Sequence, residues 1–367
     1  MFTRKGFLSI FSLLVVIVFT TGCVFGPSDD AGSEIDPPQI DYGEEEDSTD
    51  IVFEIDESDE NPETDENVSA TSTDEPSSTT ERTLYLFDEN GYVVSVSLPL
   101  PQTEGVATQA LRYLVEGGPV TNVLPSGMRA VIPAGTELSV NVKEDGTAVV
   151  DFSPEFRDYQ AEDEKGILEA ITWTLTEFDS IEQVQISING HLQETMPVDG
   201  TPVGSPLSRK DGINIEVANE AQIGNNSTVT LYFMAQNESA TVDYFVPVTR
   251  IVPKTDDLVQ ATVNELVAGP QQGSGLVTGV VDTKLLDQQL DGDVLTLNFD
   301  ETFLQYAEEE PKASDDAIKS LVLSLTEHES IDKVQFMVDG SEQLVTYSGA
   351  DLSQPVSRSF VGQSTGF

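Results

Sequence analysis

The strongest constraint on this chain is an internal repeat. The segment LTEFDSIEQVQ at 175–185 returns as LTEHESIDKVQ at 325–335, with seven identical residues in the same places. A spacing of about 150 residues is too long for the stacked units of a solenoid, which recur every ~20–50 residues. The spacing has the size of a domain, so we expect a duplicated domain.

Shorter sequence motifs recur at nearly the same offset. The sequence TLY at 83–85 matches 230–232, and LV at 114–115 matches 266–267; PLSR at 206–209 matches PVSR at 355–358, and Phe156 and Tyr159 match Phe303 and Tyr306. The duplication therefore runs through most of the chain beyond residue 80.

Each copy carries the same pattern of secondary structure. Apolar residues at helical spacing predict one helix ending near Val115 or Val267 and a second helix over 167–178 or 318–325. Alternating apolar segments predict strands before, between and after these helices, in the order β-β-α-β-β-α-β-β. We therefore predict an α+β fold of two tandem repeats, each a mixed β-sheet with two helices packed on one face.

Turn and cap residues set the expected boundaries. Four Asx-Gly pairs flanked by strands predict type I′ hairpin turns: Asp145-Gly146, Asn189-Gly190, Asp291-Gly292 and Asp339-Gly340. Thr103 and Thr255 are expected N-caps of the first helix in each copy, and the glycines at 117–118 and 269 are expected to end those helices.

The N-terminus has the pattern of an export signal. Arg4 and Lys5 precede an apolar run over 7–19, which is short for a membrane span of about 20 residues. The run ends in TTGC at 20–23, which resembles a bacterial lipobox, with cleavage between Gly22 and Cys23 and a lipid on Cys23. We expect lipidation, with palmitate among the acyl chains, because Cys23 is the only cysteine and a polar tether follows it. An ordinary secretory signal is the alternative.

Charge disfavours two kinds of partner, nucleic acid and an anionic membrane surface. The chain has 65 acidic and 17 basic residues, a formal net charge of -48, which disfavours nucleic acid. Twenty of the acids lie in 24–80, a stretch without Lys or Arg that is expected to be a disordered tether. The remaining 45 acids and 15 bases still leave the folded part at -30.

Few residues could support catalysis. One cysteine and two histidines provide little material for a zinc site or a histidine-based triad, and His191 and His328 have no histidine counterparts in the other copy. The acidic runs at 88–90 and 291–293 lack the spaced ligands of an EF-hand loop and suit turns better. Trp173 is expected to pack against a loop or the other domain. We predict no enzyme activity, no cofactor and no metal.

The repeated residues support a family resemblance. The Leu-Tyr first strand, the LVEGGP and LVAGP helix stops, the aromatic turns at 156–159 and 303–306 and the LTE-containing segments resemble the GerMN domain of sporulation and spore germination lipoproteins. The resemblance implies a fold similar to the ring-building modules of secretion systems and supplies no catalytic residues.

The resemblance also implies a biological setting. It implies a lipoprotein of a spore former, anchored to the outer face of the cell membrane, on the mother-cell membrane facing the forespore. The implied role is a scaffold for the channel complex between the two cells, with partners among the proteins of that transenvelope complex, during engulfment and later germination. Contact with the cell wall is possible on this view, and a module that binds wall glycan or peptide is the alternative. An extracytoplasmic hydrolase is the third class and lacks a visible catalytic constellation.

The expected organisation follows from these signals. We predict a signal peptide over 1–22, the acidic tether over 23–80, domains over 81–204 and 227–360, a linker over 205–226 and a tail over 361–367. The linker carries Ile213, Ile215, Val217, Ala218 and Ile223 among polar residues, so we expect 212–217 to be extended and docked rather than free.

Overall fold

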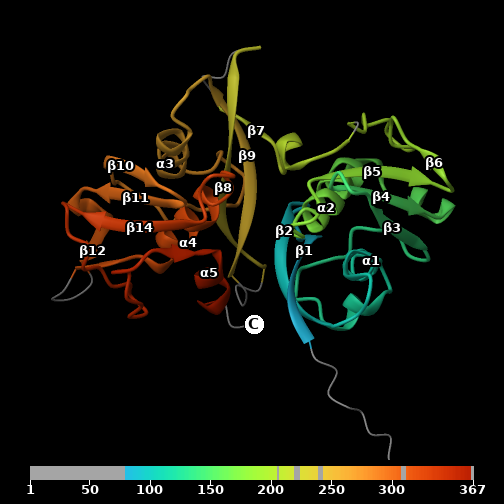
Figure 1. Cartoon of the computed structure of the whole chain (residues 1–367), viewed down its shortest axis with the longest axis horizontal. Helices are drawn as coiled ribbons and strands as arrows, with labels where there is room; N and C mark the ends of the chain where they lie inside the picture. The colour runs from blue at the N-terminus through green and yellow to red at the C-terminus, as the bar shows by residue number, and fades with distance from the viewer. Residues whose placement is uncertain (1–78, 205, 219–223, 239–242, 307–310, 365–367) are drawn as a thin grey trace, which may run out of the picture. The chain divides into compact units, whose positions relative to one another are not determined.

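The computed structural model describes residues 79–364, apart from 205, 219–223, 239–242 and 307–310 (Figure 1). The predicted signal peptide, Gly22 and Cys23, nearly all of the tether, and Ile223 lie outside the described residues. The described parts of both repeats belong to one compact unit.

The first repeat follows the predicted order of elements. Its strands and helices are β1 Thr79–Phe87, β2 Val93–Pro101, α1 Val106–Arg112, β3 Leu138–Val142, β4 Thr147–Phe152, α2 Glu164–Leu175, β5 Gln183–Ile188 and β6 His191–Leu192. Short 3-10 helices at Pro119–Asn122, Pro154–Arg157 and Ala161–Asp163 lie between them, and a further one, Arg209–Asp211, follows β6.

The second repeat has the same order with additions. Its elements are β8 Asn226–Gln236, β9 Asp243–Pro253, α3 Leu258–Ala268, β10 Leu285–Asp291, β11 Val294–Phe299, β12 Leu304–Tyr306, β13 Pro311–Ala313, α4 Asp315–Leu325, β14 Lys333–Val338, β15 Val356–Ser357 and α5 Arg358–Ser364. A 3-10 turn, Glu301–Phe303, precedes β12, and β7 Glu216–Val217 comes before β8 in the chain.

Each repeat is built on one mixed four-stranded sheet. The strand orders are β3-β4-β5-β6 and β10-β11-β14-β15, and the central pairs β4–β5 and β11–β14 are parallel. Parallel pairing requires a crossover, which α2 and α4 supply. The α+β class and the tandem repeat are confirmed.

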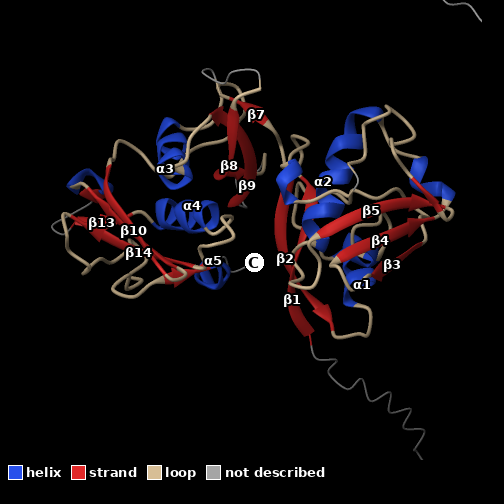
Figure 2. Cartoon of the chain, turned by 45° about the horizontal axis from the view of Figure 1, so that its top comes forward, coloured by secondary structure: helices blue, strands red, loops and turns tan. Residues whose placement is uncertain are grey.

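One detail of the layering differs from the expectation. The first two strands of each repeat form separate antiparallel hairpins, β1–β2 and β8–β9, and β7 adds to the second of these. The second helix of each repeat contacts both its hairpin and its four-stranded sheet, so a β-layer covers each side of it, as Figure 2 shows for α4. These helices are therefore buried on more than one stripe.

Small hydroxyl side chains explain this double burial. Thr174 on α2 accepts a hydrogen bond from the Tyr85 backbone N–H at 3.0 Å, and Ser324 on α4 does the same for Tyr232 at 2.9 Å. Ser320 donates to the Tyr232 carbonyl at 2.6 Å. These hydroxyl groups interrupt the apolar faces of α2 and α4. They form hydrogen bonds with backbone groups of β1 and β8 that do not pair within the hairpins.

The hairpin turns were predicted correctly in two of four cases. Asn189-Gly190 and Asp339-Gly340 have positive φ at both positions, as type I′ requires. Asp145-Gly146 is positive only at Gly146, because the connection between β3 and β4 is longer than two residues. Asp291-Gly292 is also wrong, because Asp291 pairs with Val294 and Gly292 is the first loop residue.

The predicted caps need correction. The N-cap of α1 is Gly105 rather than Thr103, and the N-cap of α3 is Asp257, whose carboxylate accepts from the Gln260 N–H at 2.9 Å, rather than Thr255. Gly269 ends α3 as predicted.

Helix α1 is shorter than the sequence pattern suggests. It ends at Arg112, before the expected stop at 117–118, because the Leu114 carbonyl accepts hydrogen bonds from the backbones of Val131 and Ile132. Gly118 instead caps the 3-10 helix Pro119–Asn122.

Candidate functional site at the junction of the repeats

The described residues offer no assembled catalytic or metal centre. No group of three or more His, Cys, Asp or Glu side chains in this part of the chain could hold a metal ion. His191 is exposed on β6, and the His328 ring lies 3.3 Å from the Thr262 hydroxyl between neighbouring helices. The carboxylate of Asp88 is occupied by the N–H groups of Asn90 and Tyr92.

A set of three polar residue types recurs in both repeats and converges at one place. Each set has a tyrosine on the first strand, a glutamate just beyond the second helix and an arginine near the end of the repeat. The two sets are Tyr85, Glu177 and Arg209, and Tyr232, Glu327 and Arg358.

The first set is bound together within its own repeat. The Tyr85 hydroxyl donates to Glu177 Oε1 at 2.9 Å, and Arg209 forms an ion pair with the same carboxylate. The Arg209 guanidinium also lies 4.3 Å from the ring centre of the buried Trp173, and its Nε donates to the Thr176 hydroxyl at 2.9 Å. Stacking and hydrogen bonds therefore fix the direction of Arg209.

The second set repeats this arrangement. The Tyr232 hydroxyl donates to Glu327 Oε1 at 2.7 Å, and Arg358 Nη1 approaches the same oxygen at 2.7 Å. Arg358 Nη2 donates to the Tyr232 hydroxyl at 2.8 Å, so these three side chains form a closed network.

Arg209 joins the two sets. Its Nη1 lies 3.0 Å from Glu327 Oε2, so the Glu327 carboxylate is held between a guanidinium from each repeat. The Glu327 side chain is 10% exposed. Burial raises the pKa of this carboxyl group, but Arg358 and Arg209 outweigh it and lower the pKa of Glu327 to about 2.

The network is not symmetric. Arg209 reaches the glutamate of the other repeat, whereas the reciprocal contact of Arg358 with Glu177 is not among the ion pairs of the described residues. The side chains of Arg358 and Glu177 both line an open cleft beside the network.

The segment after Arg209 makes a second set of contacts. Ile213 is fully buried, its N–H donates to the Thr249 hydroxyl at 3.0 Å, and its carbonyl accepts from the Thr249 N–H at 2.8 Å. The Trp173 indole N–H donates to the Gly212 carbonyl at 3.2 Å, so this tryptophan packs against a loop as expected. Ile215 and Val217 are exposed.

Asn214 connects the hairpins of the two repeats. Its side-chain amide donates to the carbonyls of Val93 on β2 and Pro247 on β9, both at 2.7 Å, and its oxygen accepts from the Val93 N–H at 3.0 Å. The backbone at Asn214 is left-handed with φ 46°, which asparagine tolerates better than most residues. The Tyr244 hydroxyl adds a 2.9 Å bond to Asp88 across the same boundary.

These contacts orient one repeat against the other. The sequence contained the signal, since Tyr, Glu and Arg occupy the same places in both copies of the TLY, LTE and P-x-S-R motifs. The spacing alone did not show that the two copies meet.

The sequence-predicted lipidation site is not placed by this structure, since Gly22 and Cys23 precede the described residues. Within the described part of the chain, no helix has the length and apolarity needed to cross a membrane.

Comparison with known proteins gives consistent matches. The Germane family, described as sporulation and spore germination, matches residues 83–194 and 230–344. The spore germination protein GerM of Bacillus subtilis (strain 168) is 43% identical over 357 residues, which cover 94% of each chain. The solved tandem GerMN domains of the sporulation protein GerM from Bacillus subtilis match with a TM-score of 0.71 and 44% identity. That match covers 77% of this chain and 97% of the solved one.

Proposed function

The chain belongs to the Germane family of sporulation and spore germination proteins, and from that premise we propose that it acts as a non-catalytic assembly factor in spore formation. It is a homologue of GerM, a sporulation and germination protein with tandem GerMN domains that is not of a known enzyme family. On this proposal the chain is lipid-anchored at Cys23 to the outer face of the mother-cell membrane. There it supports the complex that connects this cell to the forespore.

The observation that carries this proposal is the bonded junction of the repeats. Arg209, Asn214 and Tyr244 each make hydrogen bonds or ion pairs across it, to Glu327, Val93 and Asp88 respectively. A scaffold benefits from such rigidity, because each side chain ordered only on binding costs about 0.5–1.5 kcal/mol. A fixed pair of domains presents a composite surface without that cost.

Two capture experiments test the proposal against its alternative. Full-length protein is cross-linked in sporulating cells and purified, and its membrane-protein partners are quantified by mass spectrometry; in parallel, it is incubated with purified wall fragments. We expect enrichment of proteins of the transenvelope complex and no saturable binding to wall fragments. Saturable wall binding without such partners would support a wall-binding module instead.

The anchor is tested separately by Cys23→Ala. We expect the variant to remain uncut or to be released from the membrane, because the thioether-linked lipid is the proposed attachment once the signal is removed. Fractionation and mass determination check this, with wild-type protein as the control. A variant that is processed and still tightly membrane-bound would contradict lipidation at Cys23.

A further inference from the structure

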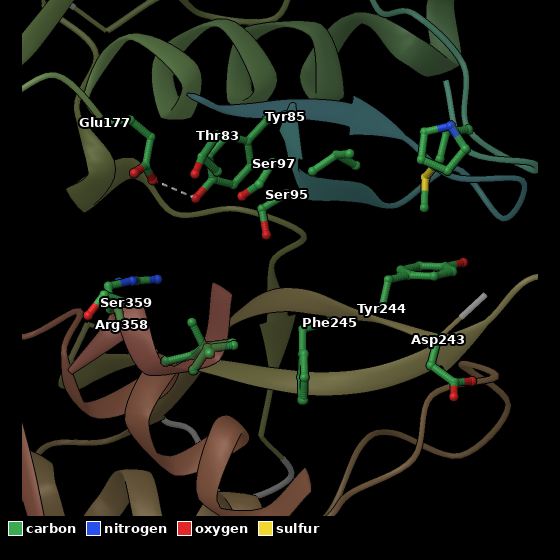
Figure 3. A pocket seen from close by; sticks show the side chains of 15 residues that line it. Thr83, Tyr85, Ser95, Ser97, Glu177, Asp243, Tyr244, Phe245, Arg358 and Ser359 are labelled. Atoms are coloured by element: carbon green, nitrogen blue, oxygen red, sulfur yellow. Dashed lines mark hydrogen bonds between the residues drawn. The ribbon is translucent and has the colours of Figure 1, made fainter. Parts of the chain in front are cut away.

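A cleft of about 330 Å³ lies beside the junction, between the β1–β2 hairpin and strand β9 (Figure 3). Thr83, Ser95 and Ser97 line one side, and Tyr244 and Phe245 line the other. Further residues of β1 and β2 complete the hairpin side of the lining.

Strand β2 has an unpaired edge along this cleft. Its hydrogen-bonded strand neighbour is β1, and on the opposite edge the Asn214 amide binds both the N–H and the C=O of Val93. Backbone groups on one edge of an antiparallel pair recur every second residue. The N–H and C=O groups of Ser95 and Ser97 therefore point to the same open edge as those of Val93.

Strand β9 has a matching unpaired edge. It pairs with β8 along its whole length, whereas β7 covers it only at Arg250 and Ile251. The Pro247 carbonyl is bound by Asn214 and the Thr249 N–H by the Ile213 carbonyl, which identifies the odd-numbered residues as outward-facing. By the same alternation the N–H and C=O groups of Phe245 face the cleft.

The two open edges are bridged by Asn214 and line the same cleft. Within the described residues no backbone group pairs with the outward groups of Ser95, Ser97 or Phe245. From Asn214 into the cleft, β2 runs with increasing residue number and β9 with decreasing number, so the edges are antiparallel. Asn214 already bridges them at one end with bonds of strand type. Exposed edges of this kind are templates for strand addition.

We propose that this cleft binds one extended segment of a partner polypeptide, inserted as a strand between β2 and β9. The segment would pair with Ser95 and Ser97 on one side and with Phe245 on the other, continuing the bridge that Asn214 begins. It would join the two hairpins into one sheet, a form of β-augmentation in which main-chain bonds supply the affinity.

Charge determines the kind of segment. The exposed carboxylate of Asp243 lies at the cleft. The other two charged side chains of the lining are already paired, Glu177 with Arg209 and Arg358 with Glu327. The folded part of the chain is strongly acidic as a whole. The cleft therefore fits a segment that alternates lysine or arginine with small β-branched residues.

Peptide binding to the full-length protein in detergent tests this inference, which stands apart from the proposed cellular role. The probe is a fluorescein-labelled peptide of alternating lysine and valine, followed by fluorescence anisotropy. We expect binding at least about tenfold tighter than that of a glutamate–valine peptide or an N-methylated lysine–valine peptide, because these lose charge complementarity or main-chain donors.

Two variants at one position separate backbone pairing from side-chain effects. Ser95→Pro removes the outward N–H without touching the bonds to β1, and proline is tolerated at such edge positions; Ser95→Ala keeps the N–H. We expect Ser95→Pro to weaken binding about tenfold and Ser95→Ala to change it less than about twofold, with both variants melting like the wild type. Absence of lysine–valine peptide binding, equal binding of the N-methylated peptide, or equal effects of proline and alanine would overturn the proposal.

Discussion

At the scale of single residues, the acidic character of the chain makes Glu327 unusual. Acids outnumber bases by 65 to 17, yet this carboxylate lies between two guanidinium groups in a largely buried site. A buried ion pair is weak evidence for net stabilisation, but removal of one partner leaves uncompensated charge and is costly. Removal of the Glu327 carboxylate should therefore lower the stability of the fold more than removal of any of the exposed acids around it.

Glu327→Gln is expected to lower the free energy of unfolding by about 3 kcal/mol, near the lower end for a broken buried pair, because both arginines remain partly exposed. Urea denaturation at neutral pH measures this. The matched control is Glu329→Gln, since Glu329 pairs with Lys210 at a site where both side chains are more than four-fifths exposed. Its expected effect is within about 0.5 kcal/mol. Equal losses for the two variants would contradict the central place of Glu327.

Glu164 provides the pH-dependent case. Its carboxylate accepts from the N–H groups of Val198, Asp199 and Thr201 and from the Tyr159 hydroxyl, at 2.7–3.0 Å. Burial raises the pKa of Glu164, but the hydrogen bonds from Asp199 and Thr201 prevail and lower it to about 2. The folded pKa thus lies below the unfolded value of about 4.3.

Glu164→Gln is expected to lower the free energy of unfolding by about 2 kcal/mol near neutral pH. The NH2 group of glutamine is a donor and cannot accept the hydrogen bonds that one carboxylate oxygen accepts. A depressed carboxyl pKa gives stability that is present above the unfolded pKa and lost as pH falls toward the folded one. The difference between wild type and variant should therefore shrink between about pH 4.5 and pH 2, as measured by denaturation at several pH values. A difference independent of pH, or matched by the exposed Glu162→Gln, would refute this account.

At the scale of elements, the hairpin and the second helix of each repeat form one packed unit. Close packing of α2 on the β1–β2 hairpin depends on Gly166, since a Cβ there would lie 2.4 Å from the Phe87 ring. Helix propensity favours alanine over glycine by about 1 kcal/mol. The steric contact opposes this preference and should prevail.

Gly166→Ala is therefore expected to destabilise the protein by about 1–3 kcal/mol, as overpacking does in a well-filled core. Thermal and urea unfolding report the change. Gly204→Ala is the control, because its added Cβ would have no neighbour closer than 3.6 Å. Stabilisation by Gly166→Ala would show that propensity outweighs the contact with Phe87.

Most elements were predictable because their signals are local. The repeat of LTE-containing segments predicted the duplicated α+β fold, and Asn189-Gly190 and Asp339-Gly340 predicted their turns. The type I′ turns predicted at Asp145-Gly146 and Asp291-Gly292 were wrong, because the turn type depends on loop length and register. Both are determined by the pairing of the neighbouring strands. Helix α1 stopped early at Arg112 because Leu114 pairs with a distant segment. The junction was hidden for the same reason: Arg209 and Glu327 are far apart in sequence, and no local pattern shows their contact.

At the scale of the whole molecule, a few side chains around Trp173 connect the two repeats. Arg209 reaches Glu327, and Asn214 reaches both hairpins. Trp173 is the only tryptophan, and it is buried beneath Arg209 with its N–H on Gly212. Its fluorescence therefore reports directly on this junction.

The double variant Arg209→Ala with Asn214→Ala is expected to loosen the repeats without unfolding either one, because each repeat keeps its own hairpin and its own four-stranded sheet. Its Trp173 emission should shift to longer wavelength, and the distribution of distances between spin labels on the two repeats should broaden. Thermal unfolding should change from one transition toward two, since cooperativity between domains depends on their interface. Lys210→Ala is the control, because its ion pair with Glu329 is exposed and worth little. If the double variant keeps a narrow distance distribution and a single transition, these contacts do not fix the repeats, and the proposed scaffold loses its structural basis.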